Sequence, residues 1–270
     1  MRRTTLFLIL STALFLTIAA GQDVREVHKI LPLSKGGQVS IDTYKGSITL
    51  TPWERDEVDV TAKIEPDDQW FDGSPEAFQE DVNNTEIVIE GRNSEVRIKT
   101  DYEKLRHHRK GFWSVLDDGG TSLPFVHYTI KVPQKAELKV KDYKSRTKIS
   151  NLQSNVSFYT YKGDVDISNL TGSINLETYK GEVQIGFTKL SDDSRVETYK
   201  GEIELSLPKS AGFSLDSDLG RKADFNTDFG FVRETTGKRR QSYEFRGPVN
   251  GGGPTLHLKS TKGTYRLRGI

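Results

Sequence analysis

The 270-residue chain contains no Cys, so its fold does not depend on disulfides. Its 39 basic and 38 acidic residues nearly balance, and net charge therefore favours neither nucleic acid nor a membrane surface as a partner. Beyond the N-terminal segment, no stretch is apolar enough to span a bilayer.

Residues 1–21 are typical of a secretory signal peptide. Arg2 and Arg3 precede an apolar run from Leu6 to Ala20, which ends in small residues. A spanning helix needs about 20 apolar residues and this run is shorter, so a membrane anchor is the weaker interpretation. We therefore expect cleavage near Gly21 and an exported protein.

Strands are predicted between residues 37 and 64. Val39 and Ile41 alternate with polar residues before Gly46, and the same alternation continues in "SITL" after it. The segment "TPWERDEVDVTAKI" predicts a further strand over residues 51–64. Alternation of this kind is typical of a strand that buries one face.

Residues 65–126 interrupt this pattern and are predicted to form an irregular insertion. Ser74 and Pro75 are residue types preferred at the start of a helix, so one short helix is expected there. Strands resume in "EIVIEG" and "EVRIKTDY". The segment "KLRHHRKGFWSVLDDGGTS", with a basic patch around His107 and His108, is predicted to be an exposed loop.

An internal repeat in the second half of the chain predicts the fold. Gly163, Gly172 and Gly181 are evenly spaced, and apolar residues follow each at the second and fourth positions. Two such units make a period of about 18 residues, which favours a flattened coil stacked on the next coil. The predicted fold is all-β, a single-stranded β-solenoid or β-helix-like array over residues 22–270 with coils of about 18 residues. A meander of hairpins is the competing interpretation, but the repeat lacks Asn-Gly and Asp-Gly turns.

One corner of the predicted coil has a fixed residue order. In "TYKG" an inward Thr ends the buried row, Tyr and Lys point outward, and Gly turns the chain. Asp142 and Ser145 replace the Thr and the Gly at one corner, and Thr261 replaces the Tyr in the last coil. The Tyr of this order occurs at Tyr44, Tyr143, Tyr161, Tyr179 and Tyr199.

Three features together resemble the putative adhesin family of bacterial envelope proteins. They are the segment "HYTIKVPQKAELKVKDYKSRTKISNL", the repeated "T-x-x-G-[DE]-[VI]-x-[IL]" corners, and the ending "NGGGPTLHLKSTKGTYRLR". The resemblance covers about residues 37–268 and is strongest over 127–208 and 251–268. It implies an exported, solenoid-like array of short strands, located in the periplasm or at the cell surface of a bacterium, and it supplies no catalytic residues. Members typically carry "T-x-S-G" where this chain has Tyr-Lys before the corner Gly.

The outward Tyr and Lys side chains form the candidate ligand-binding edge, here called the Tyr/Lys edge: Tyr143, Lys144, Tyr161, Lys162, Tyr179, Lys180, Tyr199 and Lys200. In stacked coils these groups repeat about every 4.8 Å, a spacing that suits an extended anionic polysaccharide. Packing of the rings on one another, with Lys opposing edge-to-edge aggregation, explains the same residues without a ligand.

No metal, cofactor or catalytic group is predicted. Asp164, Glu182 and Glu202 follow the corner Gly and most simply neutralise the lysines, which would themselves repel a divalent cation. Acidic pairs such as Asp67-Asp68, Asp117-Asp118 and Asp192-Asp193 suit a glycosidase only where two carboxyl groups face each other across a cleft.

The sequence thus predicts a non-catalytic, adhesin-like envelope protein that presents its Tyr/Lys edge to a glycan or to an envelope protein. Two alternatives stay open. One is a polysaccharide lyase or hydrolase on a β-helical scaffold, with Lys or Tyr as the base. The other is a structural protein that associates with itself end to end, because the last strand, "TYRLRGI", has no capping helix after it.

Overall fold

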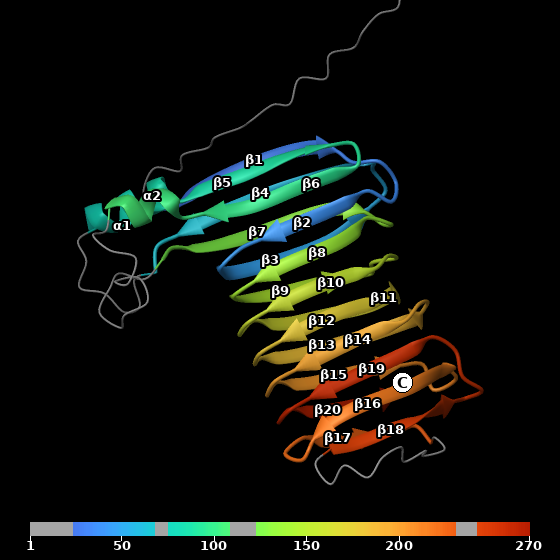
Figure 1. Ribbon diagram of the computed structural model, residues 1–270. Coiled ribbons are helices and arrows are strands. Elements are labelled where there is room, and N and C mark those ends of the chain that lie inside the picture. The colour runs from blue at the N-terminus through green and yellow to red at the C-terminus, as the bar shows by residue number, and fades with distance from the viewer. Residues whose placement is uncertain (1–23, 68–74, 109–122, 231–241) are drawn as a thin grey trace, which may run out of the picture.

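The computed structural model describes residues 24–67, 75–108, 123–230 and 242–270 (Figure 1). The predicted signal peptide, Ser74 and most of the predicted loop that follows residue 108 lie outside these ranges. The described residues are mostly β-strand and form two ten-stranded sheets, called sheets A and B. None of the helices in these ranges is long and apolar enough to cross a membrane.

The strands of each sheet lie side by side along the stack. Sheet A contains, in spatial order, β1 (Arg25–Pro32), β4 (Glu57–Glu65), β7 (Phe125–Pro133), β3 (Lys45–Trp53), β9 (Lys144–Ser150), β11 (Asp164–Gly172), β13 (Glu182–Leu190), β15 (Glu202–Leu207), β20 (Thr264–Gly269) and β17 (Asp224–Thr227). Sheet B contains β18 (Ser242–Val249), β16 (Phe213–Gly220), β19 (Thr255–Ser260), β14 (Ser194–Thr198), β12 (Ile174–Thr178), β10 (Val156–Thr160), β8 (Glu137–Asp142), β2 (Gln38–Asp42), β6 (Glu95–Asp101) and β5 (Glu86–Arg92).

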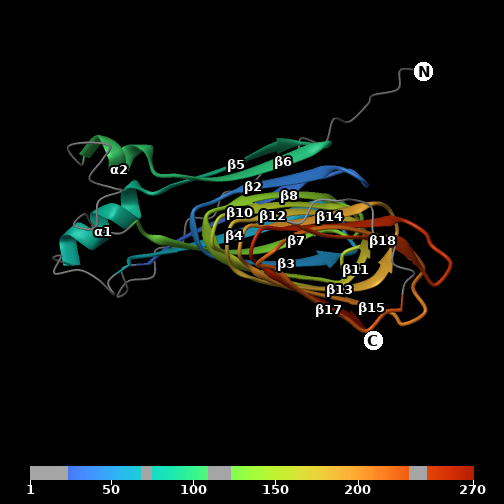
Figure 2. The same cartoon turned by 60° about the horizontal axis from the view of Figure 1, so that its bottom comes forward.

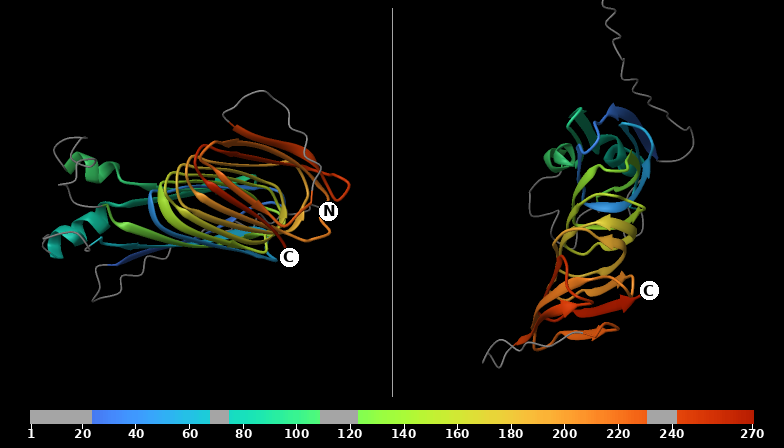
Figure 3. Two further views of the ribbon diagram at one scale, coloured as in Figure 1. Left: turned by 90° about the horizontal axis from the view of Figure 1, so that it is seen from below. Right: turned by 90° about the vertical axis from the view of Figure 1, so that its right-hand side faces the viewer.

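In the middle of the molecule the chain passes from one sheet to the other with every strand. Seen from below, these strands make two layers that close into a flattened ring (Figure 3). Equivalent strands of neighbouring coils pair in parallel, with Val156 opposite Ile174 in sheet B and Val165 opposite Val183 in sheet A. The predicted solenoid-like array of short, stacked strands is therefore confirmed.

The core lies between the two sheets and follows the predicted parity. In β10, Val156, Phe158 and Thr160 are buried, whereas the residues between them are exposed. The same alternation runs through β12 and β14. Burying a side chain such as Phe or Leu stabilises the fold by about 1.5–3 kcal/mol, so the stacked inward rows hold the sheets together.

Both ends of the stack depart from the parallel coil. At one end β4 pairs antiparallel with β1 and β7, and β5 pairs antiparallel with β6. At the other end β16 pairs antiparallel with β18. The last strand, β20, lies between β15 and β17. The last strand is therefore not the outermost one, because β17 and β18 are the outermost described strands of the two sheets at this end.

Two helices lie together at one edge of the sheets (Figure 2). Helix α1 (Pro75–Asn84) is the predicted short helix. Helix α2 (Glu103–His108) occupies the first part of the segment that was predicted to be a loop, so that part of the prediction is wrong. The backbone N–H of Glu103 donates to the Asp101 carboxylate at 2.8 Å, which caps the helix, and the side chain of Leu105 is buried.

Candidate functional site

At three of the corners the inward Thr or Ser has the same structural role. The Oγ atoms of Thr160, Thr198 and Ser260 accept hydrogen bonds of 2.9, 2.7 and 2.6 Å from the backbone N–H of the Gly that closes the corner. At a corner this N–H has left the strand ladder, and the buried hydroxyl replaces its lost partner. The Gly is required because a Cβ atom at Gly163 would lie 2.4 Å from an Asp142 carboxylate oxygen.

One corner uses a carboxylate in place of the hydroxyl. Asp142 accepts a hydrogen bond of 2.8 Å from the backbone N–H of Ser145 and another of 3.0 Å from the Thr160 hydroxyl. Burial raises the pKa of the Asp142 carboxyl above its ordinary value, and these hydrogen bonds only partly oppose that rise. Asp142 therefore takes the place of the corner Thr, but burying its carboxylate costs electrostatic free energy.

The outward tyrosines stack on one another along the corner. Successive ring centroids from Tyr44 through Tyr143, Tyr161 and Tyr179 to Tyr199 are 4.5, 5.0, 4.8 and 4.9 Å apart. The interplanar angles are between 3° and 18°, so the rings lie face to face. We call these five rings the tyrosine ladder. Because neighbouring rings cover one another's faces, mainly the ring edges of the half-buried ladder remain accessible.

The two ends of the ladder differ. At the upper end the ring of Tyr102, next to α2, meets Tyr44 edge-on at a centroid distance of 6.4 Å. At the lower end Thr261 follows in the next coil, and Tyr199 is 36% exposed. Tyr102 was not predicted as part of this row because it lies in the insertion, outside the repeat. The ladder therefore ends against the ring of Tyr102 at its upper end, whereas at its lower end no ring of the described residues covers Tyr199 from below.

The lysines of the Tyr/Lys edge are exposed beside the ladder. The Nζ atom of Lys162 lies 5.2 Å from the ring centroid of Tyr161, and that of Lys200 lies 5.4 Å from the centroid of Tyr179. These distances are within the range of cation–π attraction. Lys144 and Lys180, like the other two, have solvent-exposed side chains, so all eight predicted edge residues lie along one corner of the stack.

The lysine of the first corner behaves differently. Lys45 is 1% exposed, forms an ion pair of 2.5 Å with Asp67, and lies 4.3 Å from the ring centroid of Phe125. Burial lowers the pKa of the Lys45 ammonium, although Asp67 opposes that shift. This lysine therefore joins the insertion to the first coil and is not part of the outward edge.

A hollow of about 510 Å³ lies at the lower end of the ladder, on the sheet B side. We call it the ladder hollow. The rings of Tyr159, Tyr161, Tyr179 and Tyr199 line it together with Glu177, Glu197, Asp218, Gly220, Lys259 and Thr261. Tyr159, at 46% exposed, is among the most exposed large apolar side chains of the described residues. Aromatic, anionic and cationic groups thus meet in one depression.

The acidic residues after the corner Gly bond along sheet A. The backbone N–H of Glu182 donates to Asp164 at 3.1 Å, and Glu202 forms an ion pair of 3.2 Å with Arg266. Within the described ranges no ion pair joins these acids to a lysine of the Tyr/Lys edge. No group of three or more His, Asp or Glu side chains in those ranges is arranged to hold a metal ion.

The acidic pairs that could have suited a glycosidase have structural partners. Asp67 bonds to Lys45, as described above, and the Asp192 carboxylate accepts the backbone N–H of Asp193 at 2.8 Å. Asp193 in turn accepts the backbone N–H of Thr255 at 2.6 Å. Asp68, Asp117 and Asp118 lie outside the described residues, as do the side chains of His107 and His108 at the end of α2.

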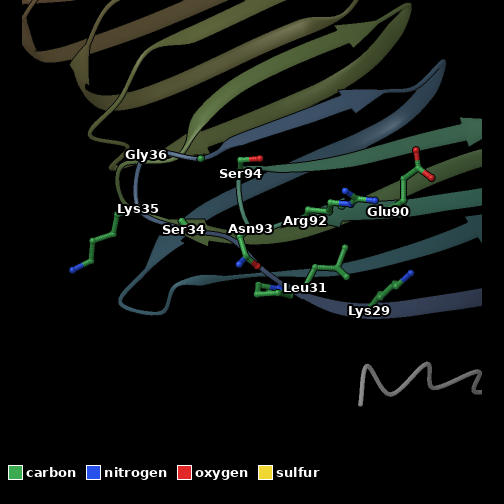
Figure 4. Close-up of a pocket in the computed structure, with 12 residues that line it drawn as sticks. Lys29, Leu31, Ser34, Lys35, Gly36, Glu90, Arg92, Asn93 and Ser94 are labelled. Atoms are coloured by element: carbon green, nitrogen blue, oxygen red, sulfur yellow. The ribbon is translucent and has the colours of Figure 1, made fainter. Parts of the chain in front are cut away.

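A second, wider hollow of about 930 Å³ lies at the opposite corner of the coil, where the turn after β1 leads into sheet B (Figure 4). Lys29 and Leu31 of β1 and Glu90 and Arg92 of β5 line it. Lys29 donates to the backbone carbonyl of Ile89 at 2.6 Å, so it also ties the two edge strands together. Among the described residues no aromatic ring lines this hollow, which sets it apart from the ladder hollow.

Comparisons with known proteins give a family and several similar structures. The family model described as toastrack DUF4097 matches residues 34–264. No curated protein sequence matches the chain. A "putative cell adhesion protein" from Clostridium sporogenes is 13% identical, with a TM-score of 0.41, covering 90% of this chain and 99% of that chain. A "putative adhesin" from Bacteroides fragilis is 12% identical, with a TM-score of 0.39, covering 91% and 97%. A "putative lipid binding protein" from Parabacteroides distasonis is 14% identical, with a TM-score of 0.25, covering 92% and 97%.

Proposed function

Because the chain belongs to the toastrack DUF4097 family, we propose that it is a non-catalytic, adhesin-like protein of the bacterial envelope that binds an extended glycan along its Tyr/Lys edge. One observation carries this proposal. The tyrosine ladder is a continuous row of five stacked rings bordered by exposed lysines.

The ladder is a rigid surface with a repeated chemistry. Face-to-face stacking fixes the ring positions, so little side-chain freedom is lost when a ligand binds. Ring edges, phenolic hydroxyls and ammonium groups recur from coil to coil, and the hydroxyls and ammonium groups can donate hydrogen bonds. A polysaccharide with carboxylate or sulfate groups offers acceptors that also repeat along a chain. The edge therefore fits an anionic polysaccharide better than it fits a compact small molecule.

A non-catalytic role agrees with the chemistry of the described residues. General acid–base catalysis needs a titratable group that can approach the substrate with a suitable pKa. The buried carboxylates of Asp67 and Asp142 are held by Lys45 and by the corner hydrogen bonds. Their roles in the fold explain them without a reaction.

The proposal is tested with protein lacking residues 1–21 and a panel of anionic and neutral polysaccharides. The triple variant Lys162→Gln/Lys180→Gln/Lys200→Gln removes three charges from the Tyr/Lys edge. The matched control Lys139→Gln/Lys141→Gln/Lys148→Gln removes three exposed charges from the faces of the sheets. We expect the edge variant to lose about ten-fold or more in affinity for the anionic polymers, with the control close to wild type. Equal affinities of the two triple variants for the anionic polymers would contradict a role of the Tyr/Lys edge in binding.

A further inference from the structure

The ladder hollow runs along the sheet B side of the ladder from Tyr161 down to Thr261, and its lower end lies where a sixth ring would continue the tyrosine ladder. In the corners above, each ring stacks 4.5–5.0 Å from the next. Thr261 occupies the equivalent position below Tyr199, and its exposed side chain is much smaller than a ring. Gly220 borders the same space, and a Cβ atom there would lie 2.5 Å from the Thr261 carbonyl oxygen. Gly220 thus lets its strand pack closely on Thr261, and within the described ranges the small side chain of Thr261 leaves the lower face of Tyr199 without a stacked ring.

A neighbouring lysine leaves room for a ring in this position. The Nζ atom of Lys262 lies 5.3 Å from the ring centroid of Tyr199. One coil above, Lys200 lies 5.4 Å from Tyr179, yet the ring of Tyr199 also stacks on Tyr179 at 4.9 Å. A cation at this distance and a stacked ring are therefore compatible on the same tyrosine. Lys262 does not prevent a ligand ring from stacking on Tyr199.

Charged groups around the hollow indicate the kind of ring. Glu177, Glu197 and Asp218 bring three carboxylates to it, and Lys259 brings an ammonium group. Glu197 is shared with Arg195 and, at 3.7 Å, with Lys259, which fixes its orientation. An apolar aromatic ring placed here would desolvate these carboxylates without giving them hydrogen bonds. A sugar ring has a C–H face that stacks on an aromatic ring and hydroxyl groups that donate to carboxylates.

We infer that the lower end of the ladder hollow is a subsite for one uncharged pyranose ring of the glycan, stacked on Tyr199 as the sixth ring of the ladder. Its hydroxyl groups donate to Glu197 and Asp218. The whole hollow, of about 510 Å³, has room for such a ring at its lower end and for neighbouring sugar units beside the rings above. This inference rests on the proposed function and adds to it a defined position at which the protein binds one sugar unit of the glycan chain.

The decisive variant is Thr261→Tyr, which supplies the ring that the corners above carry. Because Tyr is the usual residue at this corner, the variant is expected to fold and to melt at or above the wild-type temperature. By filling the subsite it should weaken binding of an oligosaccharide, cut from the bound polymer, by about ten-fold or more in titration calorimetry. Thr188→Tyr, an exposed substitution on β13 in sheet A, is the matched control and should bind as wild type does.

A second variant keeps the test independent of any effect on folding. Asp218→Asn preserves the shape of the hollow but removes one charged acceptor, and it should also weaken oligosaccharide binding. Wild-type affinity in Thr261→Tyr and Asp218→Asn, combined with loss of binding in the lysine triple variant, would overturn the subsite and leave the proposed function standing. Absence of glycan binding by the wild-type protein would overturn both.

Discussion

The tyrosine ladder predicts a measurable coupling free energy between neighbouring coils. Tyr161 stacks on Tyr143 and on Tyr179, and Tyr179 also stacks on Tyr199. An aromatic pair contributes about 0.5–1.5 kcal/mol beyond the area that it buries. Tyr161→Leu and Tyr179→Leu each remove two pairs, so each should cost about 1–3 kcal/mol of unfolding free energy.

The double variant removes three pairs, not four, because the two single variants share the pair between Tyr161 and Tyr179. It should therefore cost about 0.5–1.5 kcal/mol less than the sum of the single variants. Urea unfolding followed by circular dichroism gives these free energies of unfolding. The comparison requires that each transition is two-state and that the variants share one slope of free energy against urea concentration. Tyr143→Leu/Tyr199→Leu is the control, since these rings do not touch and their effects should add within about 0.5 kcal/mol. A coupling no larger than that of the control would refute stacking as a source of stability.

Three further changes have expected outcomes. Lys45→Met should lower the free energy of unfolding by about 3–5 kcal/mol because it removes the cation from a buried carboxylate, and Lys45→Met/Asp67→Leu should recover much of that loss in the same urea assay. The raised pKa of Asp142 means that its contribution to stability is present at acidic pH and is lost as the pH rises through that pKa. Asp142→Thr should therefore gain stability relative to wild type as the pH rises from acidic to neutral, and a pH-independent difference in melting temperature would contradict this cause. Gly46→Ala should strongly lower the free energy of unfolding, since the φ of Gly46 is +128° and a Cβ atom would lie 2.0 Å from the Val126 carbonyl oxygen. Gly186→Ala is the control. The nearest atoms to a Cβ there lie at 3.9 Å, so the free energy of unfolding should change by less than about 1 kcal/mol.

The strands and the corner order were predictable because they are local. A strand alternates its side chains between two faces, so Val156, Phe158 and Thr160 could be assigned to the core before the structure was known. The corner Gly was equally predictable from its spacing. What the pattern could not give was the orientation of the rings. Their stacking depends on the register between coils, and the step from Glu182 to its partner Glu202 is longer than the step from Val165 to its partner Val183.

The ladder hollow was not predictable for a different reason. Glu197, Lys259 and Asp218 come from β14, β19 and β16, which lie side by side although they are far apart in the sequence. The repeat loses its period after Pro208, so nothing in the sequence placed β16 next to β19. Helix α2 was missed because such a short helix has too few residues to show a periodicity.

The position of the last two strands determines the order in which the molecule can be completed. β19 lies between β14 and β16, and β20 lies between β15 and β17, so the C-terminal residues enter both sheets between strands that precede them in the chain. The upper coils can close without β19 and β20, but the lowest coil cannot close until both strands are in place. Because Thr261 lies between β19 and β20, the ladder hollow also requires both strands. Loss of even a short C-terminal segment would leave the strands above and below it without their shared neighbour.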